Sequence, residues 1–277
     1  MKKIKSSDVV AYILVIVAVG ITIFPFYLLV TTSIKPASEQ FSSPPVLIPS
    51  SVTLGAYVNV FEKWSFQSYL VNSIVVTIFS VAFSLALGVP MAYALTRFRF
   101  PRNMNDSLAF FILSLRMIPP IVGIIPIFII FRYVELNDTF QGLILAYTVF
   151  NLPFTVWIMR GFFIDLPRDF EEAGMIDGCS HLRAFAQVVL PLSIPGIVST
   201  ASLCILQSWN EFIFAVFLTS LYRKTVPVLL SSFIGDQQYL WGELTATASL
   251  AIIPALILLL LVQRELVKGM TFGAIKG

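Results

Sequence analysis

The chain has 277 residues, of which 57% are hydrophobic and 12% are charged, and its formal net charge is +3. Ordinary soluble domains are about 45–50% apolar and about 25% charged, so this composition indicates a protein embedded in a lipid bilayer. The basic residues form no stripe of the kind that binds nucleic acid, which excludes that class of partner.

Six apolar stretches are long enough to cross a membrane, because about 20 predominantly apolar residues span the hydrocarbon core as a helix. We place them at 9–34, 68–96, 107–131, 140–163, 197–219 and 243–263. Little chain remains outside them, so no separate soluble domain is expected. The sequence therefore predicts one all-α membrane domain of six transmembrane helices over residues 1–277.

The first stretch follows Lys2, Lys3 and Lys5, as the apolar part of a signal peptide would. It is too long for that role and no A-x-A-like site follows it, so we expect an uncleaved first helix. Basic residues collect on the cytoplasmic side of membrane proteins, which favours a topology with both termini cytoplasmic. In this topology the inner side has Lys2, Lys3, Lys5, Arg97, Arg99, Arg102, Arg160, Arg168, Arg183, Arg264, Lys268 and Lys276, and the outer side has Lys35, Lys63, Arg132, Arg223 and Lys224.

Residues 35–66 form the longest predicted outer loop, and aromatic residues lie near its end. They are Tyr57, Phe61, Trp64 and Phe66. Such side chains commonly anchor a protein at the membrane interface, and contact with an external partner is the alternative interpretation.

Prolines lie inside five of the six predicted helices. They are Pro25, Pro90, Pro119, Pro120, Pro126, Pro153 and Pro254. Each removes a backbone donor and strains the preceding turn, which a membrane helix tolerates where neighbours or water satisfy the freed carbonyls. Kinked helices suit a protein that changes shape, although proline is also frequent in ordinary membrane helices.

The segment 165–196 between the fourth and fifth predicted helices is acidic and punctuated by glycine. Asp165 and Pro167 are suited to start a short helix, and Gly178 can adopt the left-handed conformation that ends it. Its first turns contain acids, which the helix dipole favours there. These acids are Asp169, Glu171 and Glu172. One face of this helix of about ten residues contains Phe170, Ala173, Gly174 and Asp177.

Small residues on that face, such as Gly174, would allow close approach by another surface. Ser180 can cap a second short helix, which Pro191 and Pro195 would stop. The sequence therefore predicts a helix-turn-helix elbow on the cytoplasmic surface.

Residues 172–191 of the elbow resemble the signature loop of the integral membrane subunits of ABC importers, written E-A-A-x-x-x-G-x9-I-x-L-P. The matching positions are Glu172, Ala173, Gly178, Leu190 and Pro191, with Gly174 replacing the second alanine and Val188 replacing isoleucine. The match extends over twenty residues and precedes the penultimate helix, as in the family. A helix that only lies on the lipid surface is the alternative, but three acids and a glycine make a poor lipid anchor.

The last nine residues, GMTFGAIKG at 269–277, are similar to the terminal G-L-T-x-G-A-V-K-G of the second membrane subunit of maltose-type carbohydrate importers. The likeness extends to the six spans, the long first outer loop and the segments RMIPP and SWNEF, and so covers nearly the whole chain.

The resemblance implies a type I ABC importer permease fold and a subunit that translocates a sugar, an oligosaccharide or a polyol across the cytoplasmic membrane of a bacterium or archaeon. Its implied partners are a homologous second permease subunit, two ATPase subunits and an extracytoplasmic solute-binding protein. ATP and Mg²⁺ would bind to the ATPases, and this chain would bind no cofactor and no metal.

The resemblance also implies roles for particular residues. Coupling to the ATPases falls to Glu171, Glu172, Ala173, Gly174, Asp177 and Gly178, and contact of the tail with the ATPases falls to Thr271, Gly273 and Lys276. No nucleophile with its base and no Gly-Lys pair of a phosphate-binding loop occurs, so we expect no catalysis by this chain. An importer of a non-sugar solute and an ion-coupled secondary transporter are the alternatives, and the latter would often show internal repeats.

Two charged residues, Arg116 and Glu211, fall well within predicted helices. A central arginine facing lipid would cost about 2.5–3.5 kcal/mol, so both side chains should face the bundle interior or water. In one interpretation Arg116, Asn210 and Glu211 line a translocation path on which Trp209 stacks against a sugar. In the other, Arg116 and Glu211 form a buried pair that holds the third and fifth helices together.

Overall fold

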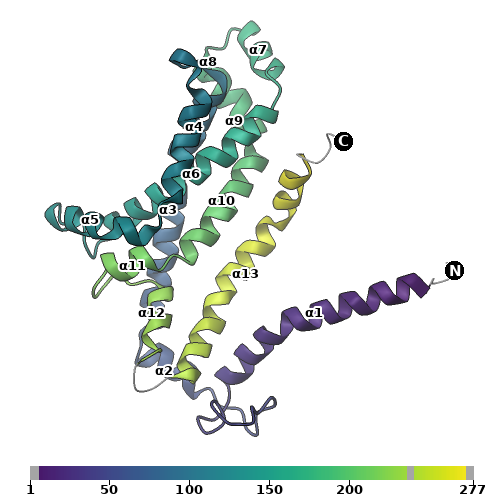
Figure 1. The fold of residues 1–277 in the computed structure, drawn as a ribbon, viewed down its shortest axis with the longest axis vertical. Coiled ribbons are helices and arrows are strands. Elements are labelled where there is room, and N and C mark those ends of the chain that lie inside the picture. Colours follow the sequence, from purple (N-terminus) through teal and green to yellow (C-terminus); the bar gives the residue numbers. More distant parts are fainter. Residues whose placement is uncertain (1–5, 236–239, 273–277) are drawn as a thin grey trace. The chain divides into compact units, whose positions relative to one another are not determined.

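The computed structural model describes residues 6–235 and 240–272, and the side chains of 10–235, 240–257 and 260. The chain divides into two compact units, residues 1–68 with 229–253 and residues 69–228 with 254–277. Every element of the described residues is helical, as predicted (Figure 1). The longest are α1 (Ser6–Ser33), α3 (Phe66–Arg97), α6 (Phe140–Asp165) and α13 (Trp241–Phe272).

Within the described ranges, three helical stretches are long and apolar enough to cross a membrane: Val10–Ser33, Phe66–Arg97 and Phe140–Asp165. Two bent pairs of helices raise this number to five if each pair is one span. The sixth predicted span, 243–263, falls in α13, where Trp241–Ile257 is a shorter apolar stretch. The structure thus supports a multi-pass protein, and the count of six stays a prediction.

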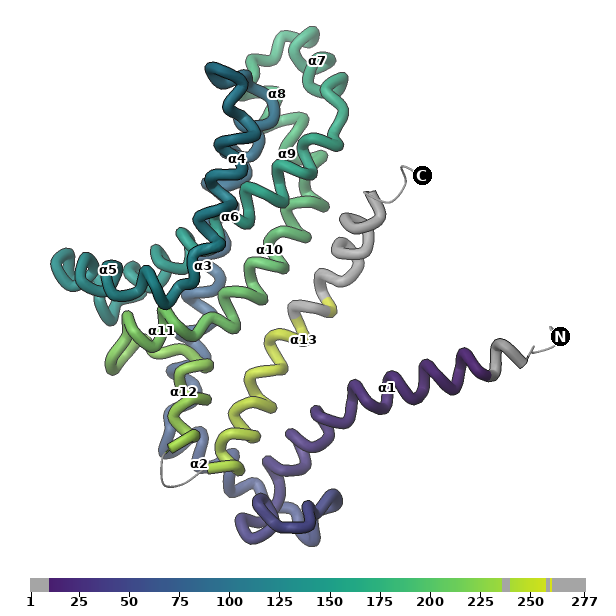
Figure 2. Tube along the Cα trace, in the orientation of Figure 1, coloured from purple at the N-terminus to yellow at the C-terminus, as the bar shows by residue number. Residues whose placement is uncertain are grey.

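The predicted helix 107–131 is not continuous. It is divided into α4 (Asn105–Ser114), the 3₁₀ turn η2 (Leu115–Met117) and α5 (Pro120–Tyr133), and the chain bends by 88° between them (Figure 2). Ile118 precedes a proline and therefore adopts an extended conformation with ψ 119°. Since Pro120 then begins α5, the two prolines end one helix and start another instead of kinking a single one.

The predicted helix 197–219 is also divided, into α10 (Ile194–Trp209) and α11 (Ile213–Leu218). A second sharp bend, of 71°, separates α10 from the helical stretch His181–Leu192 that precedes it. Pro195 lies in the first turn of α10, where its missing N–H costs no helical hydrogen bond. By contrast Pro25, Pro90, Pro153 and Pro254 lie inside helices, as expected.

In the larger unit, α3, α6 and α10 are connected by polar side chains. Ser84 donates to the Thr148 carbonyl over 3.2 Å, and Asn151 Nδ2 donates to Ser208 Oγ over 2.7 Å. A Cβ added to Gly88 would lie 2.6 Å from Cγ2 of Thr155, so glycine permits the close crossing of α3 and α6. Small residues and interhelical hydrogen bonds are the usual means of packing helices in membranes.

Two apolar clusters form the core of the same unit. The inner cluster has Val89, Ala92, Tyr93, Leu95, Ala109, Val156, Met159, Phe163 and Val189. The outer cluster has Val76, Ile124, Phe131, Leu143, Ala146, Tyr147, Phe214, Ala215, Leu218 and Val228. The inner cluster adjoins the predicted elbow, and the outer cluster contains the residues on which α5 and α11 pack.

The smaller unit includes α1, α2 (Gly55–Glu62) and the beginning of α13. Trp64 packs edge-on against Phe233, and Phe66 is buried and contacts Phe61. Tyr57 forms a 2.8 Å hydrogen bond with Ser33. These aromatic residues therefore have partners within the unit, and both interpretations of the outer loop stay predictions. The unit also contains the helix α12 (Val226–Ser232) from Leu229 onward.

Candidate functional site

The predicted elbow is present at residues 169–192. It consists of α7 (Asp169–Ile176), α8 (His181–Ala184), the π-helical segment η3 (Phe185–Val189) and α9 (Leu190–Leu192). Gly178 follows α7 with φ +90°, a left-handed conformation that glycine adopts without strain. Ser180 Oγ accepts the Arg183 amide over 3.3 Å and caps α8. The predicted stop at Gly178 and the predicted cap at Ser180 are both confirmed.

The start of α7 differs from the prediction. Asp165 is the last residue of α6, and α7 begins at Asp169 with no side-chain cap at Arg168. The helix α7 therefore has 8 residues. Pro167 lies between the two helices, where the residue before it, Leu166, is extended with ψ 119°, as a residue before proline prefers.

Gly174 of α7 packs against other residues of the elbow. Its α-carbon is buried, and an added Cβ would lie 3.2 Å from Cγ2 of Val188 and 4.0 Å from Cβ of Ala184. The small residue thus lets α7 pack closely on α8 and η3. For Gly174 this corrects the prediction that the small residues on this face allow close approach by a separate surface, whereas Ala173 on the same face is exposed.

Glu171 is buried, although its helix is otherwise mostly exposed. Its carboxylate accepts the Arg97 Nε–H in an ion pair and the Tyr93 hydroxyl over 3.0 Å. Both partners lie at the end of α3. The coupling role that the resemblance implies for Glu171 stays a prediction, and in this structure its carboxylate contacts Arg97 and Tyr93 inside the protein.

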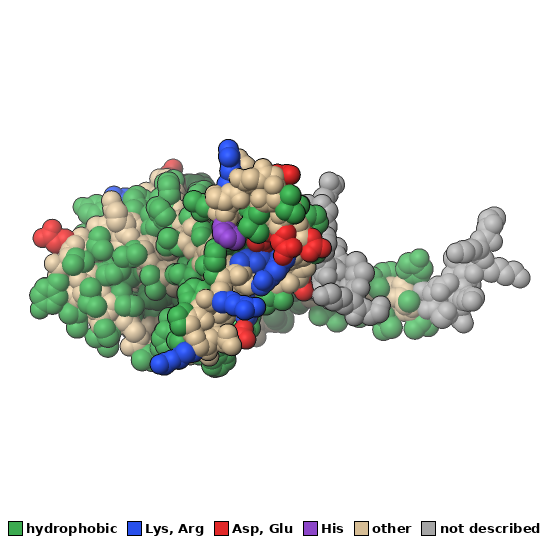
Figure 3. All heavy atoms as spheres, turned by 90° about the horizontal axis from the view of Figure 1, so that it is seen from above, with side chains coloured by type: hydrophobic (Ala, Val, Ile, Leu, Met, Phe, Trp, Pro, Cys, Tyr) green, Lys and Arg blue, Asp and Glu red, His purple; other side chains and the backbone are tan. Residues whose placement is uncertain are grey.

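The remaining predicted coupling residues are exposed: Glu172, Ala173, Asp177 and Gly178. Ile176 and Leu182 beside them are 85% and 77% exposed. Seen from the end where α7 and α8 lie, acidic and basic side chains gather near the single histidine (Figure 3). The elbow thus presents a face on which exposed apolar residues lie among charges.

The predicted tail contacts lie at the end of the chain. Gly273 and Lys276 fall outside the described residues, and Thr271 is described only as part of the backbone of α13.

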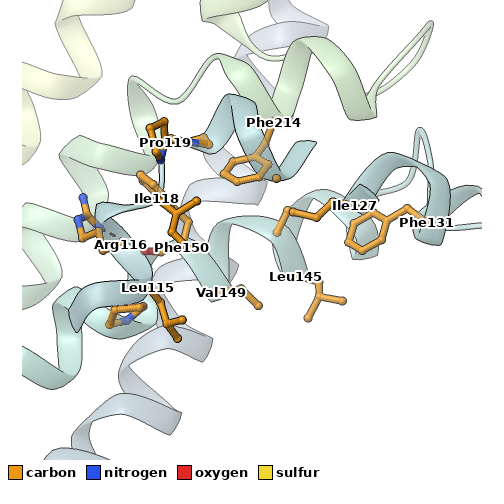
Figure 4. A pocket seen from close by; sticks show the side chains of 14 residues that line it. Leu115, Arg116, Ile118, Pro119, Ile127, Phe131, Leu145, Val149, Phe150 and Phe214 are labelled. Carbon is orange, nitrogen blue, oxygen red and sulfur yellow. Dashed lines mark hydrogen bonds between the residues drawn. The ribbon is translucent and has the colours of Figure 1, made fainter. Parts of the chain in front are cut away.

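Arg116 lies at the break between α4 and α5. Its guanidinium donates to Gln207 Oε1 and, over 3.1 Å, to the Phe150 carbonyl. Its Cζ also lies 4.6 Å from the centroid of the Phe150 ring and 4.9 Å from that of the Phe154 ring. It borders a cavity of about 330 Å³ whose other lining is apolar or glycine (Figure 4). The expectation that Arg116 faces the bundle interior is met by these contacts.

Glu211 lies between α10 and α11, and its carboxylate accepts the amides of Phe214 over 3.1 Å and Ala215 over 3.3 Å. Its backbone carbonyl accepts the Tyr147 hydroxyl over 3.3 Å. Within the part of the chain that the structure describes, Glu211 and Arg116 form no ion pair with each other. The structure therefore does not contain the pair that one interpretation proposed, because each charge has partners closer to it.

Trp209 is only 7% exposed, so its ring is not available for stacking against a sugar in this conformation. Asn210 next to it is exposed and donates to the Leu206 carbonyl over 2.7 Å. The two residues therefore face different environments despite being adjacent in the sequence.

Asp138, which was not singled out in the sequence, connects two loops on the predicted outer side. Its carboxylate accepts the side chain and amide of Ser220 and the amides of Leu221, Tyr222 and Arg223 over 2.9–3.4 Å. Burial alone would raise the pKa of Asp138, but these hydrogen bonds outweigh it and lower the pKa. The four successive amides form a nest of the kind that binds anions.

Tyr93, Arg97 and Gln207 were not predicted to be site residues, but the sequence contains signals that could have identified them. Tyr93 and Arg97 are four residues apart on one helix and so share a face. Gln207 is a polar residue inside a predicted span, which generally has a specific partner. Within the described ranges, no group of three or more His, Cys, Asp or Glu residues is arranged to hold a metal ion.

Residues 84–272 match the family model described as "Binding-protein-dependent transport system inner membrane component". The chain is 35% identical over 267 residues to the diacetylchitobiose uptake system permease protein DasC of Streptomyces coelicolor, covering 95% of each chain. It is 35% identical over 263 residues to the trehalose transport system permease protein SugB of Mycobacterium tuberculosis, covering 94% of each.

Among solved structures, a chain of a bacterial ABC transporter involved in the import of the acidic polysaccharide alginate superposes with a TM-score of 0.76. The two sequences are 25% identical, and the alignment covers 95% of this chain and 99% of the other.

Proposed function

The chain belongs to the family of binding-protein-dependent transport system inner membrane components, and from this premise we propose that it is the permease subunit of an ATP-driven importer of a carbohydrate. The relatives at 35% identity include permeases named for diacetylchitobiose and for trehalose, and both matches extend over nearly the full length of each chain. The comparisons therefore favour a sugar or an oligosaccharide as the substrate, and we include polyols in the proposed class because the sequence resemblance implies them.

The observation on which the mechanism rests is the exposed face of the elbow. Ile176 and Leu182 are large apolar side chains that are almost fully exposed, next to Glu172 and Asp177. Apolar residues surrounded by charges are typical of a protein interaction site. In our proposal this face docks on a partner ATPase subunit, which binds ATP and Mg²⁺ and hydrolyses the nucleotide, while this chain performs no catalysis.

The remaining partners follow from the same assignment. A homologous second permease would complete the pathway, two ATPase subunits would drive it, and an extracytoplasmic binding protein would deliver the solute. Both termini would be cytoplasmic, which would place Thr271, Gly273 and Lys276 on the side of the ATPases.

The translocation path is assigned to a smaller set of residues than the sequence suggested. The burial of Trp209 and the local hydrogen bonds of Glu211 favour supporting roles for these two. Asn210 is exposed and Arg116 borders the apolar cavity, so these two are the candidates for contact with solute when the pathway opens.

Reconstitution tests the proposal. The chain would be placed in vesicles with its partner permease, ATPase and binding protein, and uptake of labelled trehalose, chitooligosaccharides and polyols would be followed. We expect uptake that requires both ATP and the binding protein. Uptake by vesicles that contain this chain alone, driven by an ion gradient, would contradict it, as would ATP-dependent uptake confined to non-sugar solutes.

A pair of glycine variants tests the docking of the elbow. Gly178 and Gly161 both have open space around the position of a Cβ, but only Gly178 has a positive φ. Leucine at Gly178 should strain the end of α7 and reduce co-purification of the ATPase, whereas Gly161→Leu should leave it unchanged. Equal recovery of the ATPase with both variants would contradict docking through α7.

A further inference from the structure

The carboxylate of Glu171 is buried in a helix whose other acids, Asp169 and Glu172, are exposed. Its ion pair with Arg97 Nε is enclosed as well, since the two side chains are 8% and 7% exposed. The Tyr93 hydroxyl, from the turn before Arg97, donates to the second carboxylate oxygen over 3.0 Å. Both oxygens of Glu171 thus bind groups at the end of α3.

Arg97 connects a third element to the same pair. Its Nη2 donates to the carbonyl of Leu166 over 2.8 Å, directly after the end of α6. Arg168, in the linker between α6 and α7, donates in turn to the Thr96 carbonyl over 3.3 Å. The ends of α3 and α6 and the first turn of α7 are therefore joined through one guanidinium and one neighbouring hydrogen bond.

Aromatic rings enclose these charges. The centroid of the Tyr93 ring lies 4.5 Å from the ring centroid of Phe185, 5.7 Å from that of Phe163 and 6.1 Å from that of Phe98. Phe163 is in α6, which the polar contacts join to α3, and Phe185 is in η3, which belongs to the same elbow as α7. Exclusion of water strengthens an ion pair and makes an unpaired member costly, which favours keeping all three groups together.

The other ion pair of the described residues provides a contrast. Arg160 of α6 contacts Asp106 of α4; the Arg160 side chain is 16% exposed, but the Asp106 side chain is 88% exposed and leaves the contact open to water. Exposed pairs of this kind contribute little, because water screens them and long side chains lose entropy. Of the two pairs, that of Arg97 and Glu171 would therefore be the more costly to break.

We propose that Tyr93, Arg97 and Glu171 form a clamp that makes α7 move as one body with the cytoplasmic ends of α3 and α6. A push on the exposed face of α7 then displaces the membrane helices instead of bending the elbow. Glu171 is thus a positioning residue for energy coupling and acts through α7 rather than by touching the ATPase. This inference rests on the proposed function as an ATP-driven permease.

The attachment of α7 to α3 is separate from its attachment to η3. The contact of Gly174 with Val188 is apolar and lies within the elbow, between segments close in sequence. The clamp is the polar connection between the elbow and α3, which begins on the other side of the predicted membrane. Weakening the clamp should therefore leave the elbow folded but loosely connected.

A spin label tests the connection in this chain alone. Ile176 is replaced by cysteine in a chain with Cys179→Ser and Cys204→Ser, and the nitroxide on residue 176 is observed by electron paramagnetic resonance. Glu171→Gln keeps the shape of the side chain but removes its charge, and it should make the label more mobile. Asp106→Asn, which removes the exposed pair, should leave the spectrum unchanged. An unchanged spectrum in Glu171→Gln, or an equal change in Asp106→Asn, would overturn the clamp.

Coupling is then measured in the reconstituted importer as ATP hydrolysed per solute imported. For Glu171→Gln we expect this ratio to rise several-fold with the ATPase still bound, because movement of α7 is no longer passed to α3 and α6. Arg97→Gln should act alike, and the double variant should be no worse than either, because both remove the same pair. Additive effects, or an unchanged ratio in Glu171→Gln, would contradict the role in coupling.

The two measurements separate the inference from its premise. The label is observed without an ATPase, so an immobile label in Glu171→Gln contradicts the clamp whatever the chain transports. Absence of ATP-dependent uptake in the unmodified importer would instead contradict the proposed function.

Discussion

Glu171 and Glu211 are both buried, at 6% and 8% exposure, but the protein accommodates their charges in different ways. Glu171 pairs with an arginine 74 residues away, on another helix. Glu211 accepts backbone amides three and four residues further along its own chain. One charge joins elements that are distant in sequence, and the other shapes the local turn between α10 and α11.

The difference indicates where each region resists deformation. An ion pair between helices stabilises their relative position, so the elbow is expected to follow α3. The Glu211 carboxylate, bound to the amides of Phe214 and Ala215, stabilises the start of α11 and does not itself join α11 to another helix. We therefore expect a rigid connection at the elbow and a local one at the break in the fifth predicted span.

Replacement of Arg97 by leucine should have the largest effect on stability. It leaves Glu171 buried without its cation, and removing one member of a buried pair typically costs about 3–5 kcal/mol. The thermal unfolding midpoint of the purified chain should fall sharply. Asp106→Asn, at the exposed pair, should cost no more than about 1 kcal/mol. Similar losses in the two variants would show that burial does not distinguish the pairs.

Replacement of Glu211 by alanine should have an intermediate effect. The amides of Phe214 and Ala215 lose their acceptor, and loss of a capping side chain costs about 0.5–2 kcal/mol. Glu211→Gln retains one acceptor oxygen and should lose less. The unfolding midpoint should fall in this order while ATPase binding stays normal. Lost transport by Glu211→Gln at unchanged stability would instead assign the carboxylate to the pathway.

Replacement of Asp138 by asparagine should have the smallest effect, about 0.5–1 kcal/mol, because the amide side chain keeps one acceptor. The folded-state pKa of Asp138 lies below its ordinary 3.8, so its contribution is complete above that value and is lost as pH falls through the lower, folded-state pKa. The difference in unfolding midpoint between the native chain and Asp138→Asn should therefore be present at neutral pH and vanish under strongly acidic conditions. A difference that grows on acidification would contradict the nest.

Much of the fold could be predicted from the sequence, because apolar length and turn residues act locally. The bounds predicted for the helices at 68–96 and 140–163 differ by only a few residues from those of α3 and α6. Gly178 and Ser180 mark the turn of the elbow, as expected. The break at Pro119 and Pro120 was missed, since a pair of prolines can either kink a membrane helix or divide it. Packing of α5 against α11 stabilises the divided form.

The candidate site was predicted less completely. The pattern of Glu172 to Gly178 identified the elbow and its family, but it did not distinguish Glu171, which is buried, from Glu172, which is exposed. The sequence also allowed a pair between Arg116 and Glu211 as one of two interpretations, because both charges fall within predicted helices at depths that could let them meet. Each has nearer partners, Gln207 and the Phe150 carbonyl for Arg116 and local amides for Glu211.

The sequence alone thus determined that the chain is helical and membrane-embedded, where its elbow turns, and to which family of membrane subunits it is similar. Only the tertiary structure decided which charges meet, which glycine is packed and which acid is buried. Hydropathy, capping and signature spacing depend on residues close together in the chain. The partners of Glu171 depend on the rotation and approach of α3 and α6, which no local pattern specifies.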